Sequence, residues 1–97
     1  MRQSTFAALL LLLSSVSYAE NQLNATMLAL PCTGCHGSEG ESQQAIPSLN
    51  VMSSEQIYLA MKLFKNDQRH ATLMNRIAKG YSDSELRLIA DYFGVKP

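Results

Sequence analysis

Residues 32–36 read Cys-Thr-Gly-Cys-His, and their types and spacing could do specific chemistry. The Cys-x-x-Cys-His pattern is typical of covalent c-type haem attachment. Two thiols three positions apart can each form a thioether with one vinyl group of the same porphyrin, and the next imidazole can ligate the iron. The sequence therefore predicts haem c held by Cys32 and Cys35, with His36 as the proximal iron ligand. Because the chain has only these two cysteines, we expect one haem.

Other interpretations of the cysteine pair are weaker. A thioredoxin-like dithiol usually lies in a βαβ unit, and no strand-like alternation surrounds this pair. A structural zinc ion usually takes four protein ligands, and the fourth here would be His70, far along the chain. A disulfide between positions three apart closes a very small loop and gains little. Two alternative functions stay open: a thiol oxidoreductase without haem, and a haem enzyme or sensor with an open distal position.

Five side chains could supply a distal iron ligand: Met27, Met52, Met61, Met74 and His70. Met61 lies in the middle of an apolar helix face, where core packing is the default role of methionine. Met74 follows the proximal histidine by 38 residues, which leaves room for the chain to pass round the haem edge and return. Spacing therefore favours Met74, with Met61 and His70 next, and a bis-histidine haem would have a lower potential.

The first nineteen residues have the pattern of a secretory signal peptide. Arg2 gives a positive start, residues 6–13 form an apolar run, and Ser17-Tyr18-Ala19 places small residues at the two positions that signal peptidase reads. The apolar run is shorter than the about 20 residues of a membrane span, so an uncleaved anchor is the weaker alternative. The sequence predicts a signal peptide over 1–19 and a periplasmic domain over 20–97 with no membrane segment.

A mature chain of 78 residues is one small domain with a marginal core of its own. A covalently held haem would stabilise such a domain, because it supplies an apolar body around which helices can pack. The full chain has eight basic and eight acidic residues. No basic patch predicts nucleic-acid binding, and no basic amphipathic helix predicts a membrane surface.

Hydrophobic periodicity predicts an all-α domain of about four helices. The first begins near residue 24 and is limited by Pro31, because proline lacks an amide donor and disfavours helical geometry in the residue before it. Residues 37–53 read as a loop. The apolar positions at helical spacing in the first helix are Leu23, Met27 and Leu30.

Three more helices are predicted after the loop. Two of them begin with capping boxes, in which a serine is followed three residues later by glutamine or glutamate: Ser53 with Gln56, and Ser82 with Glu85. A shorter helix over about residues 72–79 lies between these two. The predicted apolar faces consist of Ile57, Ala60, Met61 and Phe64 in the first of the three, and Leu86, Ile89, Ala90 and Phe93 in the last.

The chain resembles the small class I cytochromes c of bacterial periplasms over nearly all of residues 20–97. The residues that carry this resemblance are Cys32-x-x-Cys35-His36-Gly37, Gly40, Pro47-x-Leu49, Met74 and Tyr92-Phe93. Residues 74–83, Met-Asn-Arg-Ile-Ala-Lys-Gly-Tyr-Ser-Asp, more closely resemble the cytochrome subunits of flavocytochrome c sulfide dehydrogenases. The resemblance implies helices wrapped around one covalently attached haem.

The resemblance also implies roles for particular residues. Met74 takes the position of the distal iron ligand. Pro47 takes the position of a proline whose backbone carbonyl accepts a hydrogen bond from Nδ1 of His36 and so orients the ring. The first and last helices cross in this family, so we expect a contact between Leu23 or Met27 on one side and Ile89, Tyr92 or Phe93 on the other.

The function implied by the resemblance is one-electron transfer, with no enzyme activity in the chain alone. Iron bound by both His36 and Met74 has no open position for a substrate. The implied donor is an FAD-containing flavoprotein subunit that oxidises sulfide, and the implied acceptor is a downstream redox protein. The alternative is a free, diffusible cytochrome c that serves another periplasmic dehydrogenase or oxidase. Arg76 and Lys79 flank Met74 and are candidates for docking a partner.

Overall fold

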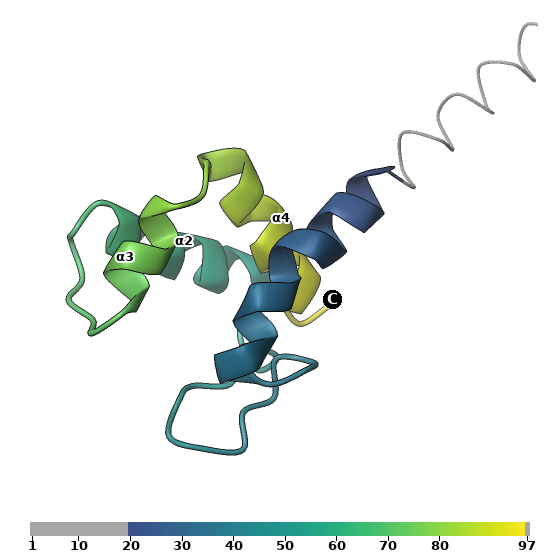
Figure 1. Ribbon diagram of the computed structural model, residues 1–97, viewed down its shortest axis with the longest axis horizontal. Helices are drawn as coiled ribbons and strands as arrows, with labels where there is room; N and C mark the ends of the chain where they lie inside the picture. The colour runs from purple at the N-terminus through teal and green to yellow at the C-terminus, as the bar shows by residue number, and fades with distance from the viewer. Residues whose placement is uncertain (1–19, 97) are drawn as a thin grey trace, which may run out of the picture.

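Helices joined by loops make up residues 20–96, the part of the chain that this computed structural model describes (Figure 1). A helix over residues 20–36 comes first, and a loop over 37–53 follows. The remaining helices are α2 (Ser54–Lys65), α3 (Met74–Lys79) and α4 (Asp83–Phe93). The predicted signal peptide lies outside the described residues. Within those residues there is no β-strand, so the all-α prediction is confirmed.

Both α2 and α4 begin with the capping boxes expected from the sequence. The Ser53 hydroxyl accepts a hydrogen bond from the Gln56 amide at 3.1 Å, and the Gln56 side chain accepts one from the Ser53 amide at 2.9 Å. Ser82 and Glu85 repeat the arrangement at 3.2 and 2.8 Å. Each box satisfies two backbone donors near the start of the helix, one of which the helix itself leaves unpaired. The predicted starts of both helices are therefore confirmed.

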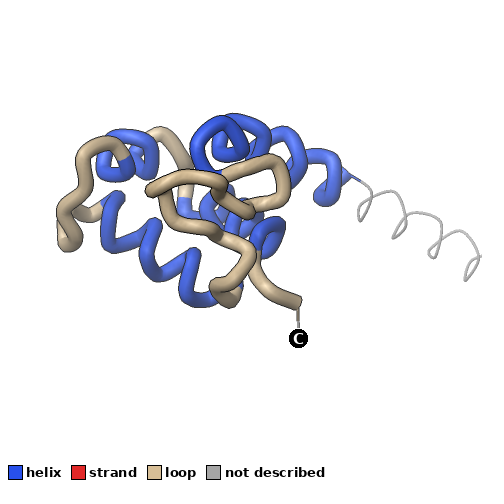
Figure 2. The backbone as a smooth tube through the Cα atoms, turned by 90° about the horizontal axis from the view of Figure 1, so that it is seen from below, coloured by secondary structure: helices blue, strands red, loops and turns tan. Residues whose placement is uncertain are grey.

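The core lies where α4 packs against α2 and against the N-terminal helix. The N-terminal helix crosses α4 in Figure 1, and Figure 2 shows the same helices and loops turned by 90°. One apolar face of α2 and one of α4 meet in this core, because the apolar residues of each helix recur at helical spacing. The buried cluster consists of Ala29, Ile57, Met61, Ala78, Leu86, Ile89, Ala90 and Phe93. The predicted face of α4 is thus buried in full, whereas Ala60 and Phe64 of α2 are only partly buried.

The expectation that the first helix is limited by Pro31 is wrong, because the helix continues to residue 36. Proline removes one helical hydrogen bond, whose acceptor would be the Met27 carbonyl four residues earlier. Met27 is 61% exposed, so water can reach this turn of the helix. Thr33 Oγ1 adds a hydrogen bond to the Leu30 carbonyl at 2.7 Å in the turn that contains the proline.

The face of the N-terminal helix that meets the core also differs from the expectation. Leu23 and Met27 are 63% and 61% exposed, whereas Ala25 and Ala29 are buried. Ala29 belongs to the same buried cluster as the apolar residues of α4. Small side chains let two helix backbones approach closely, and this close approach selects the alanine face over the face with larger apolar residues.

The loop over residues 37–53 folds back on Gly40. The Gly40 carbonyl accepts hydrogen bonds from the amides of Leu49 at 2.7 Å and Asn50 at 3.2 Å. Gly40 has a φ of 76°, and a Cβ at this position would lie 2.9 Å from Cδ1 of Phe93. Glycine is therefore needed here both for its backbone conformation and for space beneath α4.

We expect Gly40→Ala to lower the free energy of unfolding by about 1–3 kcal/mol, because the new methyl group meets Phe93 and the positive φ is strained. Gly34→Ala is the matched control. No atom lies within 4 Å of a Cβ at Gly34, which is inside the first helix, so this change should stabilise the protein by up to about 1 kcal/mol. Denaturant titration of the haem-loaded protein measures both, and equal unfolding midpoints for the two variants would contradict the prediction.

Asp83 links the start of α4 to the end of α2. Its carboxylate accepts hydrogen bonds from Lys62 at 2.6 Å and from Lys65 at 3.1 Å. The bond from Lys62 and then the bond from Lys65 hold the pKa of Asp83 below its usual range. The contribution of this carboxylate to stability is therefore present at neutral pH, and it is lost as the pH falls through the lowered pKa of the folded state.

Asp83→Asn should lower the thermal unfolding midpoint at neutral pH, and its difference from the wild type should shrink towards zero as the pH falls through the acid range. The ion pairs of Asp83 are exposed and screened by solvent, so the change in unfolding midpoint should be small. Thermal scans at a series of pH values measure it. Glu39→Gln is the control, since Glu39 has no ion pair among residues 20–96. If the difference in unfolding midpoint between Asp83→Asn and the wild type grows as the pH falls, the prediction is wrong.

Candidate functional site

The Cys-x-x-Cys-His run forms the last turn of the N-terminal helix. Cys32 is partly buried and packs against the core, whereas Cys35 is exposed, and both are free thiols. The helix ends at Gly37, whose φ is 95° and whose amide donates to the Thr33 carbonyl at 3.1 Å. A Cβ at Gly37 would lie 1.9 Å from the Glu41 carbonyl oxygen, so glycine lets the chain reverse directly after the histidine.

The His36 ring is held on one side by the loop. Its Nδ1 atom lies 2.6 Å from the carbonyl oxygen of Pro47. A carbonyl oxygen can only accept, so Nδ1 carries the proton and Nε2 keeps its lone pair. This is the arrangement that fixes the tautomer and orientation of a metal-ligating imidazole.

The two thiols differ in their surroundings. Burial raises the pKa of the Cys32 thiol, and the neighbouring Cys35 adds to the rise. The pKa of Tyr81 is also raised, by burial first and then by the charge that Cys32 can carry. Cys32 and Tyr81 both pack against the core, whereas Cys35 is exposed and open to an approaching reagent.

The candidate distal ligands lie in different environments. Met74 is the first residue of α3, is partly buried and packs against the core. Met61 is buried between α2 and α4, which agrees with a core-packing role. Met27 is exposed on the N-terminal helix, and His70 is exposed in the connection between α2 and α3. Met52 is partly buried in the same loop as Pro47.

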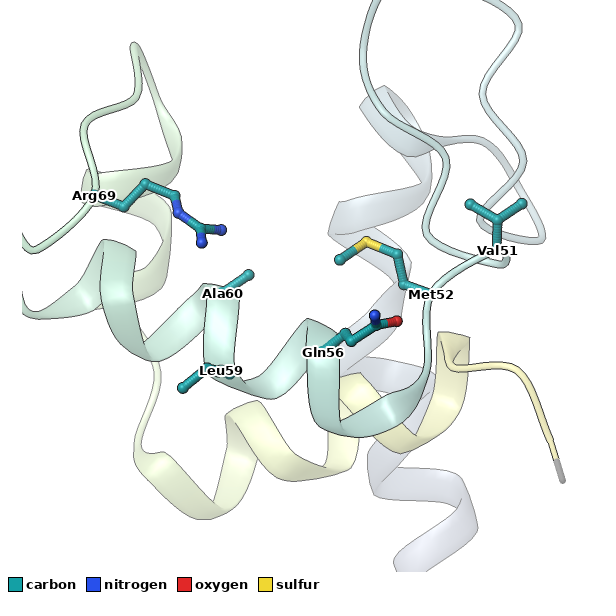
Figure 3. A pocket seen from close by; sticks show the side chains of 6 residues that line it. All are labelled: Val51, Met52, Gln56, Leu59, Ala60 and Arg69. Carbon is teal, nitrogen blue, oxygen red and sulfur yellow. The ribbon is translucent and has the colours of Figure 1, made fainter.

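An open hollow of about 380 Å³ lies above α2 (Figure 3). Met52 and Arg69 extend towards each other across it from opposite sides, and Gln56 and Ala60 form its floor. Val51 and Leu59 complete the lining, at 75% and 57% exposure. The hollow thus lies between the loop that holds His36 and the connection that leads to Met74, although these two residues are not part of its lining.

These residues fit a covalently bound porphyrin. The thiols of Cys32 and Cys35 could each bind a vinyl group, and Nε2 of His36 is free to ligate a metal. Met74 offers a thioether at the start of a different helix. The exposed apolar side chains along the hollow, Val51 and Leu59, are the kind of surface that an apolar ring would cover.

Sequence analysis missed two residues near this site. The sequence offered no role for Arg69, whose guanidinium lies 5.6 Å from the centroid of the Phe64 ring and lines the hollow. Nor did it offer one for Asn75, whose side chain bonds backbone groups of Arg69 and Ala71 in the connection between α2 and α3 and of Phe64 in α2. The only signal in the sequence was the position of Asn75 directly after Met74.

The two candidate docking residues beside Met74 differ. Lys79 forms an ion pair with Asp67 at 2.5 Å, so its charge is already partly neutralised. Arg76 is exposed and forms no ion pair within residues 20–96. Arg76 is therefore the stronger candidate of the two for meeting an acidic partner.

Comparison with known proteins finds similar cytochromes, although no family model matches the chain. The cytochrome subunit of sulfide dehydrogenase from Chlorobaculum tepidum is 50% identical over 68 residues, which are 70% of this chain and 62% of that protein. Cytochrome c-554(548) from Halomonas halodenitrificans is 33% identical over 64% of this chain and 80% of its own length. Cytochrome c-552 from Acidithiobacillus ferridurans is 34% identical over 63% of this chain and 26% of its length. The chain therefore spans less than two thirds of the sulfide dehydrogenase subunit.

Proposed function

The chain belongs to the class I c-type cytochromes, whose cofactor is covalently bound haem c, and on this premise we propose that it carries one haem and transfers single electrons. The observation that carries the proposal is the geometry of the Cys-x-x-Cys-His turn. Its histidine has Nδ1 fixed 2.6 Å from the Pro47 carbonyl and Nε2 free, at the end of a helix packed on the core.

In this proposal each site residue has a defined task. The Sγ atoms of Cys32 and Cys35 each form a bond to a vinyl carbon, and each thiol proton goes to the other carbon of the vinyl group, so no oxidant is needed. Nε2 of His36 and Sδ of Met74 would hold the iron, and two side-chain ligands would exclude substrate from the metal and confine the site to electron transfer.

Haem iron supplies the redox chemistry, because it cycles between the ferric and ferrous states by one electron. Methionine as a sixth ligand raises the potential, which suits an acceptor of electrons from a reduced flavin. We propose that the donor is an FAD-containing subunit of a sulfide dehydrogenase, which loses one electron for each ferric iron reduced. The 50% identity to the Chlorobaculum tepidum subunit supports this choice of partner. A downstream redox protein would then accept the electron.

The proposed location is the periplasm, with residues 1–19 as the signal peptide that directs export. Among residues 20–96, no helix has both the length and the apolar character needed to cross a membrane. The Cys-x-x-Cys-His run at residues 32–36 agrees with this location, since c-type haem is attached outside the cytoplasm.

Met74→Ala should abolish the weak red absorption band of methionine-ligated ferric haem and lower the reduction potential, because the sulfur ligand is lost. Visible spectra and a redox titration of the matured protein measure both effects. Met27→Ala is the matched control: Met27 is 61% exposed on the N-terminal helix, and its loss should leave band and potential unchanged. A band that persists in Met74→Ala would transfer the distal role to Met52 or Met61, whereas a wild type without the band would favour His70.

The partner is tested by co-expression of the full chain with a flavoprotein subunit of a sulfide dehydrogenase from the same organism. We expect the two proteins to co-purify as a complex. We also expect sulfide to reduce the haem only when the flavoprotein is present, and the visible spectrum measures this reduction. Arg76→Gln should weaken this association more than Lys79→Gln, since Lys79 is already paired with Asp67. If the haem-loaded protein is redox-active but neither binds the flavoprotein nor accepts electrons from it, the alternative function of a diffusible cytochrome c is favoured instead.

A further inference from the structure

The connection between α2 and α3 is fixed at its first half by backbone hydrogen bonds. The amides of Gln68 and Arg69 donate to the Leu63 carbonyl at 2.8 and 3.2 Å, and the amide of Asp67 donates to the Phe64 carbonyl at 3.2 Å. Asp67 adopts a φ of 57°, which turns the chain back over the end of α2. These bonds hold the connection only as far as Arg69, and Met74 lies five residues further on.

The second half of the connection is held by the side chain of Asn75. Its Oδ1 accepts from the Ala71 amide at 2.8 Å, and its Nδ2 donates to the carbonyls of Phe64 at 3.0 Å and Arg69 at 2.7 Å. One partly buried amide thus joins the last turn of α2, the middle of the connection and the first turn of α3. Both ends of the amide are used, so its orientation is determined by its partners.

The first turn of the helix that starts at Met74 is held by the packing of the Met74 side chain against the core and by the hydrogen bonds of Asn75. The helix is six residues long, too short to be stable by itself, and its N-cap residue Leu73 makes no side-chain capping bond. Ala78 anchors the far end in the core. The side chain of Asn75 therefore makes the side-chain hydrogen bonds that lie closest in sequence to Met74.

We propose that Asn75 is the positioning residue for the bond between Met74 and the haem iron, an inference that rests on the proposed role of Met74 as distal ligand. The three hydrogen bonds hold the connection in the one conformation that presents Met74. When they are lost, the connection opens more readily and the methionine leaves the iron more often.

Imidazole added to the ferric, haem-loaded protein tests this, because it binds the iron only where the methionine has left. We expect its apparent affinity to rise by about tenfold or more in Asn75→Ala, since three hydrogen bonds of the closed state are lost. Asn75→Asp should behave similarly: it keeps an acceptor for the Ala71 amide but loses both donors and turns a carboxylate towards two carbonyl oxygens. Spectral titration of each variant gives the affinity.

Two controls separate positioning from general stability. Asn66→Ala changes an exposed asparagine of the same connection whose side chain makes no hydrogen bond within residues 20–96. Ile57→Val weakens the buried core between α2 and α4 and lowers the unfolding midpoint. Both should bind imidazole within about twofold of the wild type, because they lie away from the bonds of Asn75.

The outcomes are distinct. Wild-type affinity in both Asn75 variants overturns the inference, and so does an equal rise in Ile57→Val, which would reduce Asn75 to a contributor to overall stability. The same titration of Met74→Ala tests the premise separately. If that variant binds imidazole no more tightly than the wild type, the proposed role of Met74 fails and the inference fails with it. A gain in Met74→Ala without one in the Asn75 variants leaves the ligand in place and rejects only the inference.

Discussion

The close approach of the N-terminal helix to one face of α4 is the constraint on which the rest of the structure depends. Ala29 lies in the buried cluster with the apolar residues of α4, and this contact fixes the rotation of the helix about its axis. Cys32, three residues later, is therefore turned towards the core, while Cys35 stays exposed at the end of the helix. The loop then passes beneath the end of α4, where Gly40 leaves space for Phe93, and returns Pro47 to His36. The cysteine pair and the orientation of the histidine thus both follow from one helix packing.

The core that supports this arrangement is thin. Within residues 20–96, four of the nine buried apolar residues are alanines, and Leu86 is the largest side chain that is fully buried. Alanine removes little apolar surface from water, so this core alone gives limited stability. Apolar side chains such as Val51 and Leu59 remain exposed along the hollow above α2. A covalently held apolar ring would extend the core where the polypeptide alone does not close it, and this makes haem a structural partner as well as a redox centre.

The parts of this fold that local chemistry determines were predictable from the sequence. The starts of α2 and α4 follow from serine capping boxes, and the apolar stripe of α4 follows from its spacing. The choice of face on the N-terminal helix was not predictable in this way, because Leu23 and Met27 are more apolar than Ala25 and Ala29. Close helix packing favours small residues, and hydrophobic periodicity alone does not reveal that. The path of the helix through Pro31 was missed for a related reason: the cost of one absent hydrogen bond is small where the unpaired carbonyl can meet water. The role of Asn75 depends on three backbone groups that only the folded connection brings together.

The two sides of the site are built with different rigidity. The side that bears Cys32 and His36 is the end of a helix of at least four turns packed on the core, with Pro47 fixing the ring. The opposite side presents Met74 from a six-residue helix, and the connection before it depends on the hydrogen bonds of one asparagine. Segments with few buried contacts open at lower free energy than the core does. We therefore propose that substitutions in the connection alter how firmly Met74 is held as the distal ligand without disturbing haem attachment, through residues such as Asn75 that need not touch the cofactor.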